Sequence, residues 1–201
     1  MAKRILDVVV SGLGLALLSP LMLALAICIK LDSRGPVLYR GERVGKDGEP
    51  FRMCKFRTMV VEADRIGPPV TYREDPRITR VGGFLRRTKL DELPQLINVL
   101  KGEMSLVGPR PEDPSYVAHY TAEQREVLRV KPGVTGPTQL EYRDEASMLE
   151  ARTADAHYLS EIMPEKLELD LLYVHNRSLA VDFKILWQTA VTLMFGDRRV
   201  L

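Results

Sequence analysis

Residues 3–30 read KRILDVVVSGLGLALLSPLMLALAICIK, and this apolar run limits which class of fold the chain can adopt. No charged residue lies between Val8 and Ile29, a length that could cross a bilayer as one helix. Ser19-Pro20 stands near the middle, and because proline removes a helical hydrogen bond, the helix should bend or break there. The serine can help satisfy the carbonyl groups that the break frees. A secretory signal is a weaker interpretation, since no small-residue cleavage site is evident.

Basic residues flank this run on both sides. Lys3 and Arg4 precede it, and Lys30 and Arg34 follow it closely. The positive-inside rule therefore favours a cytoplasmic position for both ends. Two topologies remain open: a proline-kinked helix that spans the membrane, and a re-entrant helix-break-helix that dips into one leaflet and returns.

The rest of the chain reads as mainly α with a small β-hairpin, an α+β fold. Strand-forming residues at 37–40 and 51–57 are separated by turn residues at 46–48, which predicts the hairpin. Residues 67–76 hold too many prolines for a regular element, which is typical of a mobile loop. Helical periodicity predicts helices over residues 117–130, 146–162, 164–176 and 179–195.

The last of these helices, residues 179–195, is mostly apolar and contains Phe183 and Trp187. Such a helix can lie in the membrane interface. An ordinary core helix would show the same composition. No internal repeat or linker divides the chain, so a single domain over 1–201 is expected, with 1–31 in the membrane and 32–201 forming a cytoplasmic part.

Charge is unevenly distributed along the chain. Residues 30–110 hold 17 basic and 11 acidic residues, whereas residues 111–201 hold 10 basic and 15 acidic ones. The middle segment therefore favours anionic ligands. Cys28 and Cys54 form no pattern for a metal or a disulfide framework, which suits a reduced, cytoplasm-facing protein. The three histidines show no metal-ligand spacing.

Two motifs in the middle segment carry the candidate chemistry. Residues 86–95 read RRTKLDELPQ, which sets Asp91 and Glu92 among cations at the expected start of a helix. Residues 107–111 read VGPRP, where two prolines hold the backbone of Arg110 extended. Such carboxylates could bind Mg²⁺, and Asp91 could attack a phosphorus atom. Acidic residues are also common at helix starts simply because they cap the helix.

Several basic residues are candidates for binding phosphate. They are Lys55 on the second hairpin strand, Arg86, Arg87 and Arg110. Cations of this kind spread the charge of a phosphoryl group during transfer. Each could equally serve as a surface salt-bridge partner, and the strand that carries Lys55 could present a solvated face.

The motifs together resemble the bacterial sugar transferases, the monotopic polyprenyl-phosphate phosphoglycosyl transferases. The resemblance rests on LDELPQ at 90–95, GEMSLVGPRP at 102–111 and KPGVTG at 131–136. It begins with KRILD at 3–7 and returns at 169–174, so it covers nearly the whole chain. Extra amino-terminal membrane helices of larger relatives are not seen, so the chain resembles the small, minimal catalytic form. It departs from the family pattern at 136–139, where an aromatic residue commonly follows the glycine.

The resemblance implies a re-entrant membrane helix with interfacial amphipathic helices, on the cytoplasmic face of the bacterial inner membrane. It implies that Asp91 accepts a phospho-sugar from a UDP-sugar, releases UMP, and passes the phospho-sugar to a polyprenyl phosphate such as undecaprenyl phosphate. Glu92 would position Mg²⁺ or help to deprotonate the acceptor, and Asp170, in the carboxy-terminal motif, would support the site or its substrate. This reaction is the first membrane step in the assembly of O-antigen, capsule, exopolysaccharide or glycoprotein glycans.

Two other classes of function remain. A nucleotide-sugar hydrolase would use the same carboxylates and cations, although no Walker-type glycine loop is present. A non-catalytic membrane adaptor would use Arg86, Arg87 and Lys89 to bind anionic lipid. No nucleic-acid partner is expected. The sugar is not specified by any residue, and the oligomeric state, including a homo-oligomer, is left open.

Overall fold

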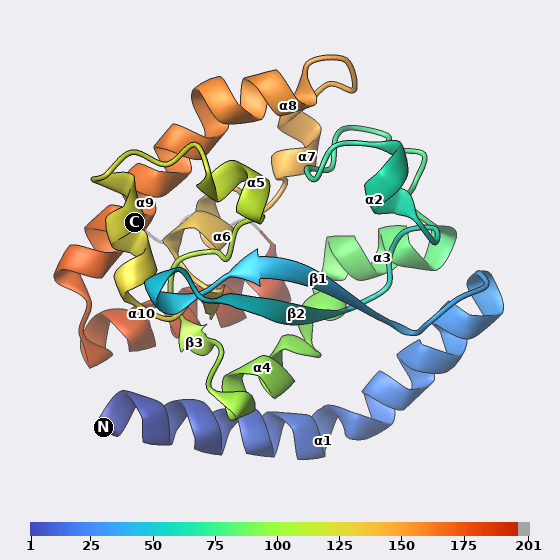
Figure 1. The fold of residues 1–201 in the computed structure, drawn as a ribbon. Coiled ribbons are helices and arrows are strands. Elements are labelled where there is room, and N and C mark those ends of the chain that lie inside the picture. Colours follow the sequence, from blue (N-terminus) through green and yellow to red (C-terminus); the bar gives the residue numbers. More distant parts are fainter. Residues whose placement is uncertain (197–201) are drawn as a thin grey trace.

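The computed structural model describes residues 1–196, and a two-stranded hairpin crosses the middle of the fold (Figure 1). Strand β1 (Leu38–Val44) pairs antiparallel with β2 (Pro50–Phe56), and the short 3-10 turn η1 (Lys46–Gly48) joins them. The hairpin predicted from the sequence is therefore confirmed. Helices surround it, so the mainly α character is confirmed as well.

The amino-terminal run forms α1 (Ala2–Asp32), which continues through Pro20. Pro20 has no amide hydrogen to donate to the carbonyl of Ala16, four residues earlier. The hydroxyl of Ser19 donates to that carbonyl instead, at 2.8 Å, as the sequence predicted. Figure 1 shows the second half of α1 turning away from the line of its first half. The chain therefore bends within one continuous helix.

One face of α1 packs against the protein, and the other is exposed and apolar. Its buried face meets α4 (Gln95–Lys101) and α3 (Arg80–Thr88), and Leu25 and Ile29 pack with Phe56 of β2. Leu13 and Leu17 on the outer face are 67% and 81% exposed. Among residues 1–196, α1 is the one helix long and apolar enough to cross a membrane.

A second small sheet was not anticipated from the sequence. Strand β3 (Ser105–Val107) pairs in parallel with β4 (Gly133–Thr135). The two strands can approach because position 133 is a glycine: a Cβ atom there would lie 2.1 Å from the amide nitrogen of Gly108. This contact explains the place of the KPGVTG motif beside the VGPRP motif.

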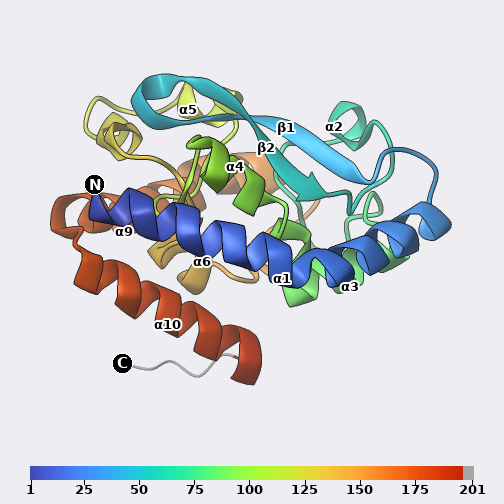
Figure 2. The ribbon, with the colours of Figure 1, turned by 90° about the horizontal axis from the view of Figure 1, so that it is seen from below.

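The two carboxy-terminal helices match the prediction closely. They are α9 (Met163–Asn176) and α10 (Leu179–Phe195), and Ser178 caps α10 by accepting a hydrogen bond from the amide of Val181. Figure 2 shows α10 on the same side of the molecule as α1. An ion pair of 2.5 Å between Lys3 Nζ and Asp182 Oδ2 joins the two helices.

Two predicted helices are interrupted. The first divides into α5 (Pro114–Val117) and the 3-10 helix η3 (Gln124–Arg129), because Thr121 and Gln124 cap each other and start a new element. The second is interrupted at Leu149, which is fully buried and whose carbonyl accepts a hydrogen bond from the amide of Arg73. The remaining short helical elements are α2 (Ala63–Ile66), η2 (Leu90–Glu92), α6 (Pro137–Glu141), α7 (Glu145–Met148), α8 (Ala154–His157) and the π-helical turn η4 (Tyr158–Ile162).

Residues 67–76 lack regular structure, as predicted, but a buried arginine organises them. Arg77 forms an ion pair of 2.6 Å with Asp75, and the two side chains are 5% and 0% exposed. The same guanidinium donates to the carbonyl groups of Pro68 and Val70. One side chain thus ties this loop to the chain that leads into α3.

We expect Arg77→Met to lower the free energy of unfolding by about 3–5 kcal/mol, because it leaves the buried Asp75 carboxylate unpaired. The matched control is Arg65→Met, which removes an arginine that is 77% exposed and pairs with Glu62. Denaturant unfolding in detergent micelles measures both. A loss for Arg77→Met as small as that for Arg65→Met would contradict this account of the loop.

Candidate active site

Asp91 and Glu92 lie in the 3-10 turn η2, between α3 and α4. The sequence placed them at the start of a helix, and α4 itself begins three residues later, at Gln95. Lys89 adopts a left-handed backbone conformation, with φ 59°, and so reverses the chain between α3 and η2. This reversal turns both carboxylates back toward the cations of α3 and the hairpin.

The end of the hairpin fixes the position of α3. A Cβ atom at Gly82 would lie 2.0 Å from the carbonyl oxygen of Thr58, so only glycine allows this close packing. The side chain of Thr58 also accepts a hydrogen bond from Arg86 Nε at 3.0 Å. Arg86 Nη1 reaches across to Thr71, at 2.7 Å. Arg86 is therefore held by two hydroxyl groups beside the carboxylates.

Glu92 is an ion-paired carboxylate. Its Oε1 atom lies 3.0 Å from Lys55 Nζ and 3.5 Å from Arg110 Nη1. Burial favours the neutral acid, but Lys55, Arg110 and Lys89 outweigh it and lower the pKa of Glu92 to about 2. Burial lowers the pKa of Lys55, although the negative charge of Glu92 acts to raise it. Glu92 is thus ionised and holds two cations in place.

Asp91 differs from its neighbour. It is 6% exposed, and its Oδ1 atom is buried without a hydrogen-bond partner in the described part of the chain. Burial raises the pKa of Asp91, and Glu92 adds to the rise, while Lys55 and Arg86 oppose it. A buried, unpaired carboxylate oxygen is costly unless a ligand completes it. The two environments therefore give these adjacent carboxylates different chemical roles.

Lys89 is a further member of the site that the sequence analysis did not assign to phosphate binding. Its Nζ atom donates to the carbonyl of Arg143 at 2.8 Å, and its charge acts on both Asp91 and Glu92. Burial lowers the pKa of Lys89. The signal for this role in the sequence was the position of Lys89, two residues before Asp91. The cluster thus brings four cations (Lys55, Arg86, Lys89 and Arg110) around two carboxylates.

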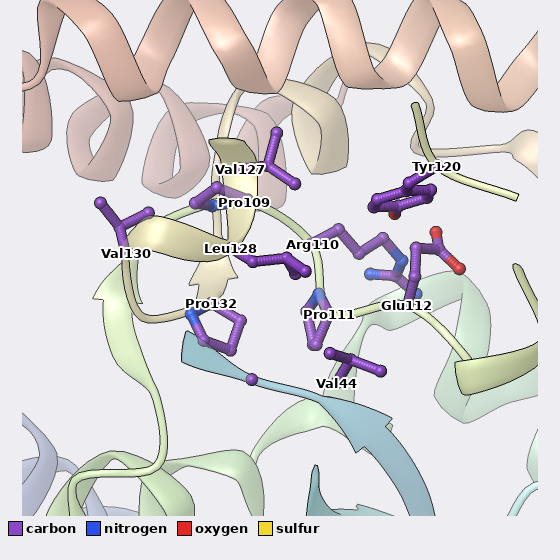
Figure 3. A pocket seen from close by; sticks show the side chains of 11 residues that line it. Val44, Pro109, Arg110, Pro111, Glu112, Tyr120, Val127, Leu128, Val130 and Pro132 are labelled. Atoms are coloured by element: carbon purple, nitrogen blue, oxygen red, sulfur yellow. The ribbon is translucent and has the colours of Figure 1, made fainter. Parts of the chain in front are cut away.

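Arg110 is presented by its backbone, as the two flanking prolines predicted. Figure 3 shows its side chain extending from the proline corner toward Glu112 and Tyr120. Asp170 accepts a hydrogen bond from the Arg110 amide at 3.2 Å, and it also accepts one from the Thr138 hydroxyl. Burial raises the pKa of Asp170 to about 7, although the two hydrogen bonds act to lower it. Asp170 therefore supports the backbone of Arg110, and the 136–139 segment contributes through Thr138.

The structure brings most of the expected residues together. Lys55, Arg86 and Arg110 converge on the carboxylates, whereas the side chain of Arg87 is exposed and makes no hydrogen bond or ion pair within residues 1–196. Asp170 contacts the backbone amide of Arg110 and not the carboxylates. A direct role in binding phosphate therefore stays a prediction for Arg87 and Asp170.

Asp91 and Glu92 are the two side chains of the site that could hold a divalent cation. No group of three or more metal-ligating side chains is found within residues 1–196. Mg²⁺ is commonly bound by one or two carboxylates together with substrate phosphates. The unpaired Oδ1 atom of Asp91, beside Glu92, is the donor set on which such an ion could be held.

The fold and the site together place four cations around two carboxylates on a domain with an apolar surface helix. Comparison with known proteins gives the family: the chain matches the bacterial sugar transferase family over residues 1–196. The chain belongs to this family.

Three relatives show how closely it matches. A UDP-glucose:undecaprenyl-phosphate glucose-1-phosphate transferase of Escherichia coli is 43% identical over 93% of this chain and 39% of that protein. A UDP-N-acetylgalactosamine-undecaprenyl-phosphate N-acetylgalactosaminephosphotransferase of Aeromonas hydrophila is 38% identical over 96% of the chain and 44% of that protein. A second glucose-1-phosphate transferase, of Caulobacter vibrioides, is 42% identical over 97% of the chain and 70% of that protein. The chain thus spans about two fifths of the length of the first two.

We expect the cation cluster to bind inorganic pyrophosphate, and Arg110→Met to weaken that binding by about 10- to 100-fold, since a hydrogen bond to a charged group contributes about 1.5–3 kcal/mol. Arg52→Met is the control, because Arg52 is an exposed arginine on β2, the strand that carries Lys55. Isothermal titration calorimetry measures both. Equal weakening in the two variants would show that the ion is attracted by overall charge and not by this cluster.

Proposed function

We propose that the chain transfers a sugar-1-phosphate from a UDP-sugar to undecaprenyl phosphate or a similar polyprenyl phosphate, through a covalent intermediate on Asp91. The observation that supports this proposal most directly is the buried, unpaired Oδ1 atom of Asp91 inside a cluster of four cations. The names of the relatives supply the donor and acceptor classes. They differ in the sugar, so the sugar stays open. The reaction would be the first membrane step of glycan assembly.

The reaction would run in two displacements. In the first, a carboxylate oxygen of Asp91 attacks the phosphorus that carries the sugar, an O–P bond forms, and the bond to UMP breaks with its electron pair. In the second, an oxygen of the polyprenyl phosphate attacks the same phosphorus and releases Asp91. The product is a polyprenyl-diphosphate-sugar. One site can thus serve a soluble donor and a lipid acceptor in turn.

The cations would hold the phosphates and offset the charge that repels the attacking carboxylate. Lys55 and Arg110 are already fixed by Glu92, so little reorganisation is needed when substrate arrives. Mg²⁺, when bound on Asp91 and Glu92, would add charge neutralisation on the substrate's phosphates. Because its pKa is about 2, Glu92 would be a weak base. A role in positioning the cations is therefore favoured over a role in deprotonating the acceptor.

We further propose that α1 is a re-entrant membrane helix on the cytoplasmic face of the inner membrane, with α10 in the interface beside it. Three observations support this: the bend at Ser19-Pro20, basic residues near both ends of α1, and the exposed apolar outer face. Phe183 and Trp187 of α10 are 55% and 66% exposed, and α10 lies on the same side of the molecule as α1 (Figure 2). A site at headgroup depth could then reach the phosphate of a lipid acceptor.

We expect Asp91→Asn to abolish transfer, by roughly 10⁴-fold or more, because it removes the nucleophile. Wild-type protein incubated with Mg²⁺ and a radiolabelled UDP-sugar alone should become labelled on Asp91, and UMP should be released once per site. Asp47→Asn, at an exposed carboxylate, is the control. Full activity of Asp91→Asn would remove the covalent mechanism. UMP release over many turnovers without polyprenyl phosphate would instead favour a hydrolase.

The topology has a separate test. Cysteines placed as Ala2→Cys and Arg34→Cys, in a Cys28→Ser background, should both be protected from a membrane-impermeant thiol reagent in intact cells and both react after lysis. The reason is that a re-entrant helix keeps both ends in the cytoplasm. Labelling of either position from outside the cell would support a spanning helix instead.

A further inference from the structure

A side-chain amide on α4 is bonded to the strand that carries Lys55. Asn98 is completely buried, at 0% exposed. Its Oδ1 atom accepts a hydrogen bond from the Cys54 amide at 2.9 Å, and its Nδ2 atom donates one to the Arg52 carbonyl at 2.8 Å. One side chain therefore joins α4 to β2 through two backbone groups of the strand.

These two backbone groups lie on the edge of β2 that faces away from β1. The Arg57 amide bonds the Val37 carbonyl, and in an antiparallel pair every second residue faces the partner strand in this way. Cys54 and Arg52 fall between the residues of this alternation, so their backbone groups turn away from β1. Asn98 thus takes the place that a neighbouring strand would fill.

The orientation of the Asn98 amide is fixed by a third partner. Its Nδ2 atom also donates to Glu103 Oε2 at 2.7 Å, so both of its donors and its acceptor are in use. The reversed orientation would set the amide oxygen against the Arg52 carbonyl and the Glu103 carboxylate. The backbone carbonyl of Asn98 accepts hydrogen bonds from Gly102 and Glu103 at the end of α4, which holds the residue from the other side.

This contact joins the two segments that carry one ion pair of the site. Cys54 directly precedes Lys55 on β2, and α4 follows the turn η2 that holds Glu92. Lys55 Nζ lies 3.0 Å from Glu92 Oε1. A lysine side chain is flexible, so the place of its backbone decides where the ammonium group can rest. The amide of Asn98 fixes that backbone against the helix next to Glu92.

We propose that Asn98 is a positioning residue for the phosphate site. It sets the place of β2 against α4 and so holds Lys55 at Glu92, beside Asp91. This inference rests on the proposed function, because it gives Asn98 a part in the reaction through Lys55. The side-chain bonds of Asn98 go to β2 and Glu103, so it acts on the lysine and not on a substrate.

The first test measures the exposure of Lys55 and needs no substrate. The whole protein in detergent is treated with a trace of acetic anhydride in mildly alkaline buffer, and mass spectrometry gives the acetylation rate of each lysine. Lys55 and Lys166 should both react slowly in the wild type, since their side chains are 16% and 5% exposed and paired with carboxylates. Asn98→Ala should raise the rate for Lys55 by about 5-fold or more, because losing two hydrogen bonds to β2 makes local opening easier, and leave Lys166 unchanged.

Leu149→Ala is the control for a general loss of stability. Leu149 is fully buried in a different cluster of the core, so this variant should unfold more easily without faster acetylation of Lys55. Equal rises for Lys55 and Lys166 in Asn98→Ala, or no rise for Lys55, would overturn the inference. Asn98→Ser, which keeps a polar group but is too short to bond both backbone groups, gives the same comparison if Asn98→Ala does not fold.

The second test is a double-mutant cycle on pyrophosphate affinity, measured by isothermal titration calorimetry. Asn98→Ala should weaken binding by about 5- to 50-fold when Lys55 is present and by less than about 2-fold in a Lys55→Met background, because its effect runs through that lysine. Equal weakening in both backgrounds would overturn the inference. If a UDP-sugar does not label Asp91, or pyrophosphate does not bind the wild type, the proposed function loses its support, while acetylation still decides whether Asn98 holds Lys55.

Discussion

The pairing of Glu92 with Lys55 and Arg110 is the interaction on which the rest of the site depends. Burying two adjacent carboxylates would cost several kcal/mol each if no cation met them. The two cations come from distant segments, β2 and the proline corner after β3, so the ion pairs also fix how these segments meet. Once Glu92 is satisfied, the remaining positive charge acts on Asp91, which has an oxygen without a partner. The ion-paired carboxylate and the proposed nucleophile are thus neighbours in sequence.

The apolar surface helices are linked to the same site by polar contacts. Asp7, which lies directly before the apolar run and is 4% exposed, accepts hydrogen bonds from the Ser105 hydroxyl and the Leu106 amide of β3. Lys3 bonds the carbonyl of Val107 and pairs with Asp182 of α10. These contacts hold α1 and α10 against β3, and Arg110 follows three residues after the end of this strand.

Local patterns predicted much of this structure, and long-range pairing accounts for what they missed. The hairpin, the Ser19 hydrogen bond, the cap at Ser178 and the last two helices follow from neighbouring residues, so their sequence signals were sufficient. Strands β3 and β4 are three residues each and mostly buried, so no alternation marks them. The interruption at Leu149 depends on burial against distant residues. The motifs identified Asp91, Glu92, Lys55, Arg86 and Arg110, whereas Lys89 was considered only as a possible lipid-binding residue, and the structure places it beside both carboxylates.

Arg110 shows how acidic residues from separate segments support one cation of the site. Glu92, Glu145 and Glu112 together raise the pKa of Arg110 against the effect of burial. Arg110 therefore stays charged beside Glu92, whose Oε1 atom lies 3.5 Å from its Nη1 atom. An arginine suits this position better than a lysine, because its planar fork can contact groups on two sides at once.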